Sequence, residues 1–97
     1  MNKTEHLLTC LIEECAEIQK AATKALRFGL DDHALDQIIT NGESIAEEFI
    51  DLTAVIELLE NEDIIPSRRS TQSTQTKKNK IEKYMRYAES RCTLIKD

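Results

Sequence analysis

The sequence predicts an all-α fold of two long antiparallel helices followed by a C-terminal helix. Gly and Pro are scarce, with two and one among 97 residues, which disfavours the many turns of a β-sandwich or barrel. Apolar residues instead recur every three or four positions, the period of a helix with one buried face. We expect one domain over residues 1–97. Because a chain this short buries only about 60–65% of its unfolded surface, we also expect association into an oligomeric helical bundle, as a homodimer or homotetramer.

The first predicted helix covers residues 4–28. It is a run of good helix formers without Gly or Pro, and Gly29 is placed to end it. Thr4 is its expected N-cap, because a threonine hydroxyl accepts a hydrogen bond from the first helical N–H groups. Residues 30–41 are rich in Asp, and we expect them to form a loop that holds at most one short turn.

Two further helices are predicted. The second covers residues 42–61, with Thr40 or Asn41 as its cap. Its apolar residues repeat at spacings of four and three: Ile45, Phe49, Leu52, Ile56 and Leu59. Residues 62–76 contain a run of Ser, Thr and Gln and are expected to form a polar connection. The third helix covers residues 77–95, with a second apolar face.

Charge is distributed unevenly along the chain. Residues 1–66 hold 4 basic and 15 acidic residues, whereas residues 67–97 hold 9 basic and 3 acidic ones. The start of the sequence lacks the apolar segment of a signal peptide, and no apolar run approaches the roughly 18 residues of a membrane span. The three cysteines lack metal-ligand spacing and favour reduced thiols. We expect a cytoplasmic protein without a membrane partner.

Two carboxylates fall within the apolar faces of the first two helices. At about 100° per residue, Glu14 points into a stripe of small and aliphatic residues, and Glu48 points into a similar one. The stripe around Glu14 is formed by Leu7, Leu11, Ile18, Ala21 and Ala25, and the stripe around Glu48 by Ile45, Leu52, Val55 and Leu59. Glu17 and Asp51 follow three residues later, at the edge of each stripe. The segments 12–18 and 46–52 therefore look like an internal repeat of one half-site.

This arrangement predicts a cation site. Buried carboxylates that face one another must either protonate or enclose a cation. Oxygen ligands without His or Cys favour Mg²⁺, with Mn²⁺ as the other candidate. We predict that Glu14, Glu17, Glu48 and Asp51 are the ligands. A magnesium site of this kind commonly bridges to substrate phosphates, which indicates phosphate-ester or phosphate-anhydride chemistry.

The paired motifs Glu13-Glu14-x-x-Glu17 and Glu48-x-x-Asp51 resemble the EExxE and ExxD signature of the MazG-like, all-α nucleoside triphosphate pyrophosphohydrolases. The segments 24–29 and 80–84 are also similar to stretches of small phage and bacterial members of that family, so the resemblance covers most of the chain. It implies an enzyme that uses Mg²⁺ to hydrolyse a (deoxy)nucleoside triphosphate to the monophosphate and pyrophosphate, in nucleotide-pool control. The implied source is a bacterial cell or a phage-infected host.

Further site residues are predicted around the four ligands. Glu13 is the candidate catalytic residue, which would orient a water or act as its base. Phosphate oxygens are expected to meet basic side chains, as Arg suits bidentate contact and Lys acts as a point charge. The candidate phosphate-binding residues are Lys24, Arg27, Lys80 and Lys83, and Asn41 and Tyr84 are weaker candidates for contact with the base or ribose.

Other interpretations of the sequence stay open. The basic C-terminal segment is also compatible with a helical, oligomeric nucleic-acid-binding or interaction module, although a net charge of −5 disfavours nucleic acid as the partner. A plain helical oligomerisation protein would leave Glu14 and Glu48 without a purpose. Within the enzyme interpretation, a different phosphohydrolase is the alternative.

Overall fold

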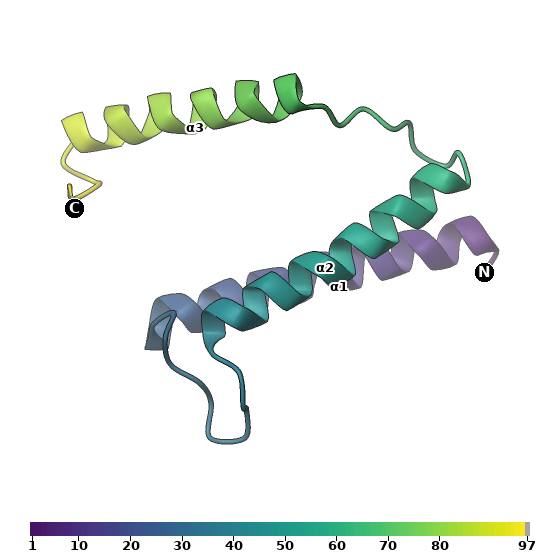
Figure 1. The fold of residues 1–97 in the computed structure, drawn as a ribbon, viewed down its shortest axis with the longest axis horizontal. Coiled ribbons are helices and arrows are strands. Elements are labelled where there is room, and N and C mark those ends of the chain that lie inside the picture. The colour runs from purple at the N-terminus through teal and green to yellow at the C-terminus, as the bar shows by residue number, and fades with distance from the viewer. Residues whose placement is uncertain (97) are drawn as a thin grey trace. The chain divides into compact units, whose positions relative to one another are not determined.

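The computed structural model describes residues 1–96 and contains three α-helices, with no strand in this range. Helix α1 covers Lys3–Phe28, α2 covers Asn41–Asn61 and α3 covers Thr71–Ser90 (Figure 1). The chain divides into two compact units, Met1–Pro66 and Ser67–Asp97. The all-α fold is thus confirmed, and the prediction of one domain over 1–97 stays a prediction.

Helices α1 and α2 pack against each other and run antiparallel (Figure 1). An ion pair of 2.7 Å joins Lys3 Nζ, at the start of α1, to Glu62 Oε1, just after the end of α2. At the opposite end, the side chain of Asn41 binds the backbone of Gly29. The predicted ranges 4–28 and 42–61 are confirmed to within one residue at each end.

Side-chain caps fix where the two helices begin. The expected cap Thr4 is wrong, because Asn2 lies one residue before α1 and its side chain accepts a hydrogen bond of 2.8 Å from the N–H of Glu5. Thr40 caps α2, in a capping box in which Thr40 and Glu43 bind each other's backbone N–H groups. These hydrogen bonds with Thr40 favour the charged form of the Glu43 carboxyl and lower its pKa.

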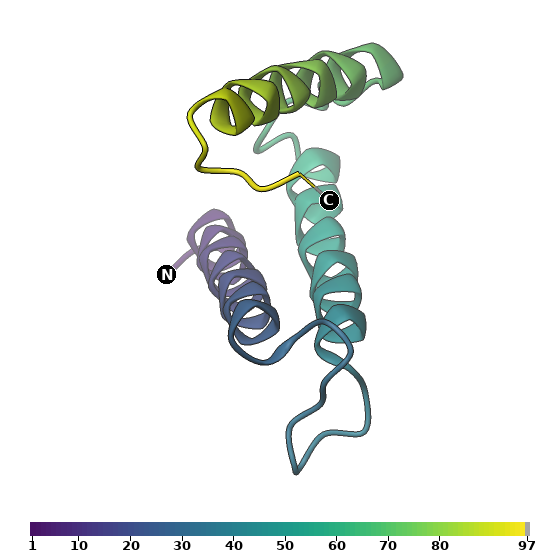
Figure 2. The same ribbon diagram turned by 90° about the vertical axis from the view of Figure 1, so that its left-hand side faces the viewer.

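The loop of residues 29–40 extends beyond the ends of α1 and α2, as Figure 2 shows from the side. It starts at Gly29, whose φ of 100° is open to glycine but strained for other residues. The buried Asn41 holds both ends of the loop. Its backbone N–H donates to the carbonyl of Asp32 at 2.7 Å, and its Nδ2 donates to the carbonyl of Gly29 at 2.9 Å. Asn41 therefore joins the first part of the loop to the start of α2 through both its backbone and its side chain.

The core between α1 and α2 is small. Its buried apolar side chains are Leu7, Ala21, Ala25 and Leu59, of which Leu59 is fully buried. Phe49 belongs to the apolar repeat predicted for the second helix, but it is 62% exposed, because it lies about 100° around the helix from Glu48. Large apolar side chains also stay exposed elsewhere on this unit: Ile12, Leu26, Leu35, Ile38 and Ile50.

Helix α3 corrects two predicted boundaries. It begins at Thr71, not at residue 77, so that the Ser/Thr/Gln run forms its first turns and the connection shortens to residues 62–70. The reason is a local capping box between Ser70 and Ser73. The helix ends at Ser90, not at residue 95, because Cys92 adopts a left-handed conformation with a φ of 62°.

We predict that Asn41→Ala destabilises the protein by about 1–3 kcal/mol, because it removes the partner of a carbonyl at the loop anchor. The free energy of unfolding from urea titration measures this effect. The matched control is Asn61→Ala, at the exposed end of α2, which should change the free energy by less than about 0.5 kcal/mol. Equal effects of the two substitutions would contradict the anchoring role of Asn41.

We predict that Ser70→Ala weakens the first turn of α3 by about 1 kcal/mol, because the N–H of Ser73 loses its acceptor. Hydrogen exchange of the amides of residues 73–76 should become faster by roughly fivefold. Ser67→Ala, outside the helix, is the control and should leave these rates unchanged. Rapid exchange of the amides of residues 73–76 in the wild-type protein would indicate that α3 begins later in the sequence, near residue 77.

Candidate metal centre

Three carboxylates from two helices converge in the unit formed by α1 and α2. Glu14 comes from α1, and Glu48 and Asp51 come from successive turns of α2. One carboxylate oxygen of each lies within 4.8 Å of the other two. Glu14 and Glu48 are half-buried, as expected for positions on the buried faces of the helices, and Asp51 is exposed at the edge. Glu14 lies seven residues from both Leu7 and Ala21, which are buried core residues.

The environment of Glu48 disfavours its negative charge. Partial burial raises the pKa of its carboxyl most, and the nearby charges of Asp51, Glu17 and Glu14 raise this pKa further, with a smaller contribution from Glu47. The same repulsion that favours a proton on Glu48 favours a bound cation, since either one neutralises the cluster. Glu48 is therefore the electrostatic centre of the group.

Glu17 lies beside the cluster but is not one of its three converging residues. It is exposed, it is near enough to raise the pKa of Glu48, and it lines a pocket together with Glu48. Its role as a fourth ligand stays a prediction. Glu13 is exposed on α1 and is not part of the converging group, so its catalytic role also stays a prediction.

A polar pocket of about 120 Å³ adjoins the cluster, and Glu48 belongs to both. Its walls come from α1, from the start of α2 and from the loop between them. The lining residues are Glu17, Lys20, Ala21, Lys24, Gln37, Asn41, Ser44 and Glu48. Two carboxylates and two ammonium groups thus meet in one small space. A pocket lined by both negative and positive side chains suits a ligand that combines a cation with an anion.

Two of the predicted ligand-binding residues, Lys24 and Asn41, line this pocket. Arg27 does not line it, and its guanidinium lies 4.8 Å from the ring centroid of Phe28. Sequence reasoning missed Lys20 and Gln37. Lys20 follows Glu13 by seven residues and was detectable from the helical period, whereas Gln37 lies in a loop where no period applies.

The remaining predicted residues belong to the unit of residues 67–97. Lys80 and Tyr84 line a mainly apolar groove of about 430 Å³ along one face of α3. Lys83 is exposed on the same helix but does not line the groove. Ile81, Met85 and Leu94 supply much of the apolar wall. Contacts of Lys80, Lys83 and Tyr84 with a nucleotide stay predictions.

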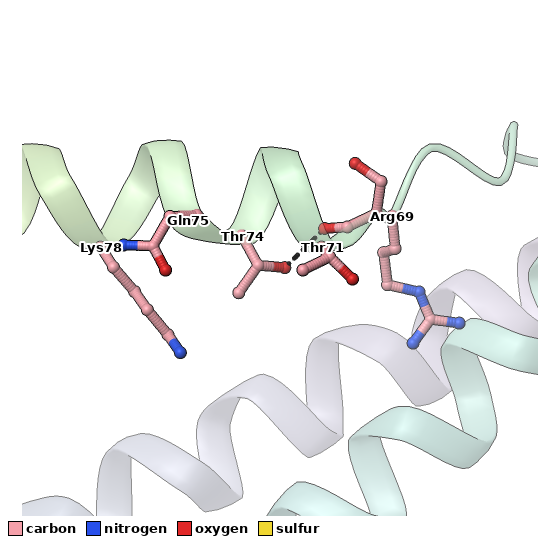
Figure 3. A pocket seen from close by; sticks show the side chains of 6 residues that line it. Arg69, Thr71, Thr74, Gln75 and Lys78 are labelled. Carbon is pink, nitrogen blue, oxygen red and sulfur yellow. Dashed lines mark hydrogen bonds between the residues drawn. The ribbon is translucent and has the colours of Figure 1, made fainter.

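A second hollow, of about 360 Å³ and lined by polar and charged residues, lies at the start of α3 (Figure 3). Arg69 and Lys78 bring positive charge to it, and Thr71, Thr74 and Gln75 lie between them. The Thr74 hydroxyl donates to the carbonyl of Ser70 at 2.9 Å, and Ser70 itself caps the helix. These hydroxyls are thus engaged in holding the helix start together.

None of the helices described over residues 1–96 is both long and apolar enough to cross a lipid bilayer.

No protein-family model, curated protein or solved structure matches the chain. The donor atoms of the carboxylate cluster indicate which cations it suits. All three donors are carboxylate oxygens, and they come from rigid helices that pack against each other. This donor set fits a hard divalent cation such as Mg²⁺ or Mn²⁺.

We predict that Glu48→Gln stabilises the metal-free protein at neutral pH. In the wild type, the raised pKa means that stability falls as the pH rises from 4.5 through the pKa of the folded state. The glutamine variant lacks this ionisation and should not show that decline. Thermal unfolding between pH 4 and pH 7 in EDTA measures the difference.

The matched control for this experiment is Glu57→Gln, an exposed position on α2 that removes the same charge. It should retain the wild-type pH dependence. Mg²⁺ or Mn²⁺ should raise the unfolding temperature of the wild type and of Glu57→Gln, but not that of Glu48→Gln. A cation response that survives in Glu48→Gln would contradict the site.

Proposed function

We propose that the protein is a Mg²⁺- or Mn²⁺-dependent hydrolase that converts a (deoxy)nucleoside triphosphate to the monophosphate and pyrophosphate. The proposal rests on one observation, which is that the carboxylate cluster adjoins the polar pocket. Glu48 belongs to both, and Lys20 and Lys24 line the same pocket. A cation site that opens directly onto ammonium groups suits a metal-bound polyphosphate.

In this proposal Glu14, Glu48 and Asp51 hold the cation, and Glu17 is a fourth ligand on the pocket side. When bound, the cation neutralises the polyphosphate and lowers the pKa of a coordinated water. Lys20 and Lys24 attract the phosphate oxygens. Glu13 receives the proton of the attacking water or orients that water. The paired motifs around Glu14 and Glu48, which resemble those of the MazG-like pyrophosphohydrolases, also support this assignment.

The proposed reaction adds one water across the anhydride between the α and β phosphates. The oxygen of the water forms a bond to the α-phosphorus, and the bridging oxygen leaves with pyrophosphate. The two protons of the water pass to the products and to the solvent. The rigid α1–α2 pair contributes by holding the carboxylates and the lysines in fixed positions before the substrate arrives.

The proposal includes a homodimer or homotetramer. Within residues 1–66, Ile12, Leu26, Phe49 and Ile50 expose most of their surface, and so many large apolar side chains are typical of a surface that another chain covers. The small core of the α1–α2 pair also favours association, because a unit of this size is only marginally stable as a monomer.

The test is a product assay with the eight common nucleoside triphosphates, each with Mg²⁺ and with Mn²⁺, in water enriched in ¹⁸O. We predict monophosphate and pyrophosphate as products, with the label in the monophosphate because the water attacks the α-phosphorus. Release of orthophosphate would indicate a different phosphohydrolase. Absence of turnover in every combination would contradict the enzyme proposal.

Two variants assign that activity to the cluster. Glu48→Gln should lower kcat/KM by roughly 100-fold or more, because loss of a supporting group near a metal already costs 10–100-fold. Glu57→Gln should stay within about twofold of the wild type. Far-UV circular dichroism should show that both variants remain folded.

A further inference from the structure

We propose that α3 packs against α2 of a second copy of this chain, so that two copies exchange their C-terminal helices. This inference rests on the homodimer or homotetramer of the proposed function and names the surfaces that form it. It is independent of the hydrolysis, so its test needs neither nucleotide nor metal. The observations behind it are the open apolar groove of α3 and the opposite charges of α2 and α3.

Helix α3 lacks a packed face within its own unit. None of its 20 residues is buried, although packing of an apolar face supplies most of the stability of a helix of this length. Ile81, Tyr84 and Met85 line the groove and expose about half of their surface. Among the residues described outside the helix, only Thr93 and Leu94 add to its wall. The groove is therefore a binding face that this unit leaves open.

The charges of the helices identify α2 as the complement of this groove. Helix α3 holds five basic and two acidic residues, and Lys77 and Lys80 stand at its groove. Helix α2 holds six acidic residues and no basic one, whereas α1 holds four of each. Opposite charges attract across an interface and like charges repel. Packing of α3 on α2 is therefore favoured over packing of α3 on α1 or on another α3.

Helix α2 also exposes an apolar surface on the side away from the carboxylate cluster. Phe49 and Ile50 are both more than half exposed, and Ile50 lies about 160° around the helix from Glu48. Glu47, which is exposed, precedes Ile50 by three residues and lies about 60° from it. An apolar surface bordered by carboxylates matches an apolar groove bordered by ammonium groups. The two surfaces are therefore complementary in both polarity and charge.

The hinge between the two units, residues 66–70, favours a partner in another copy. Its residues are exposed and lie outside the helices. It contains no glycine, and Pro66 at its start has a fixed φ and disfavours a helical turn at the residue before it. A stiff hinge opposes the return of α3 onto its own α2, and exchange of an identical element between two copies then satisfies both helices. Exchange also forms two α2–α3 contacts per dimer, where a chain closed on itself has one.

The test measures association of the full-length protein by sedimentation velocity in EDTA, without nucleotide. Met85→Glu places a carboxylate in the groove that faces the acidic α2, and Ile50→Lys places an ammonium group on the surface that faces the basic α3. Each variant should therefore raise the dissociation constant of the dimer by roughly tenfold or more. The matched control is Tyr87→Glu, which adds the same charge to α3 at an exposed position outside the groove. It should leave the constant within about twofold of the wild type.

An equal mixture of Met85→Glu and Ile50→Lys distinguishes exchange from closure of each chain on itself. In an exchanged heterodimer, α3 of the Ile50→Lys chain meets α2 of the Met85→Glu chain, and both of those surfaces are intact. We therefore expect the mixture to form more dimer than either variant alone at the same total concentration. This recovery also shows that both variants are folded.

Three results would overturn the exchange. Variants that associate as tightly as the wild type exclude these surfaces, and loss of single-stranded DNA binding in Met85→Glu would then assign the groove to nucleic acid. A mixture that recovers no dimer excludes contact between copies. A wild type that sediments as a monomer at all concentrations excludes the exchange and the homo-oligomer, and leaves the hydrolase to its own product assay. Recovery in the mixture together with absence of nucleotide turnover supports the exchange and contradicts only the proposed hydrolysis.

Discussion

The packing of α1 against α2 brings like charges together. Glu14, Glu48 and Asp51 place carboxylate oxygens within 4.8 Å of one another, and the side chains of Glu14 and Glu48 are half-buried in this pair of helices. Like-charged groups in partial burial oppose the contact between their helices. The same partial burial and like charges raise the pKa of the Glu48 carboxyl. This arrangement lowers the stability of the fold unless a proton or a cation neutralises the negative charge of the cluster.

The rest of the unit of residues 1–66 positions this cluster. The ion pair of Lys3 with Glu62 and the loop anchor at Asn41 lie at opposite ends of the helix pair. Asn41 both ties the loop to the start of α2 and lines the polar pocket, so the same residue contributes to the loop anchor and to the pocket wall. The loop then adds Gln37 to a wall otherwise built from the helices. The carboxylate cluster and the polar pocket are therefore built on the same pair of helices.

Much of this arrangement follows from helical periodicity, and some of it cannot. The seven-residue spacing from Leu7 to Glu14 to Ala21 was enough to place Glu14 among core residues, and the structure confirms the ranges of both long helices. The start of α3 was missed because Ser70 and Ser73 form a capping box within a run that composition alone marks as a linker. Gln37 was missed because a loop has no period, and its buried oxygen appears only when the loop is folded against the helices.

An anomalous difference map from crystals grown with Mn²⁺ tests the proposed cation site directly. We expect a peak bound by carboxylate oxygens of Glu14, Glu48 and Asp51, at metal–oxygen distances of about 2 Å. The side chains of α1 and α2 should stay where the metal-free cluster already holds them. A map with no peak between the two helices at millimolar Mn²⁺, or with carboxylates that turn away from one another into solvent, would show that the cluster is not a cation site.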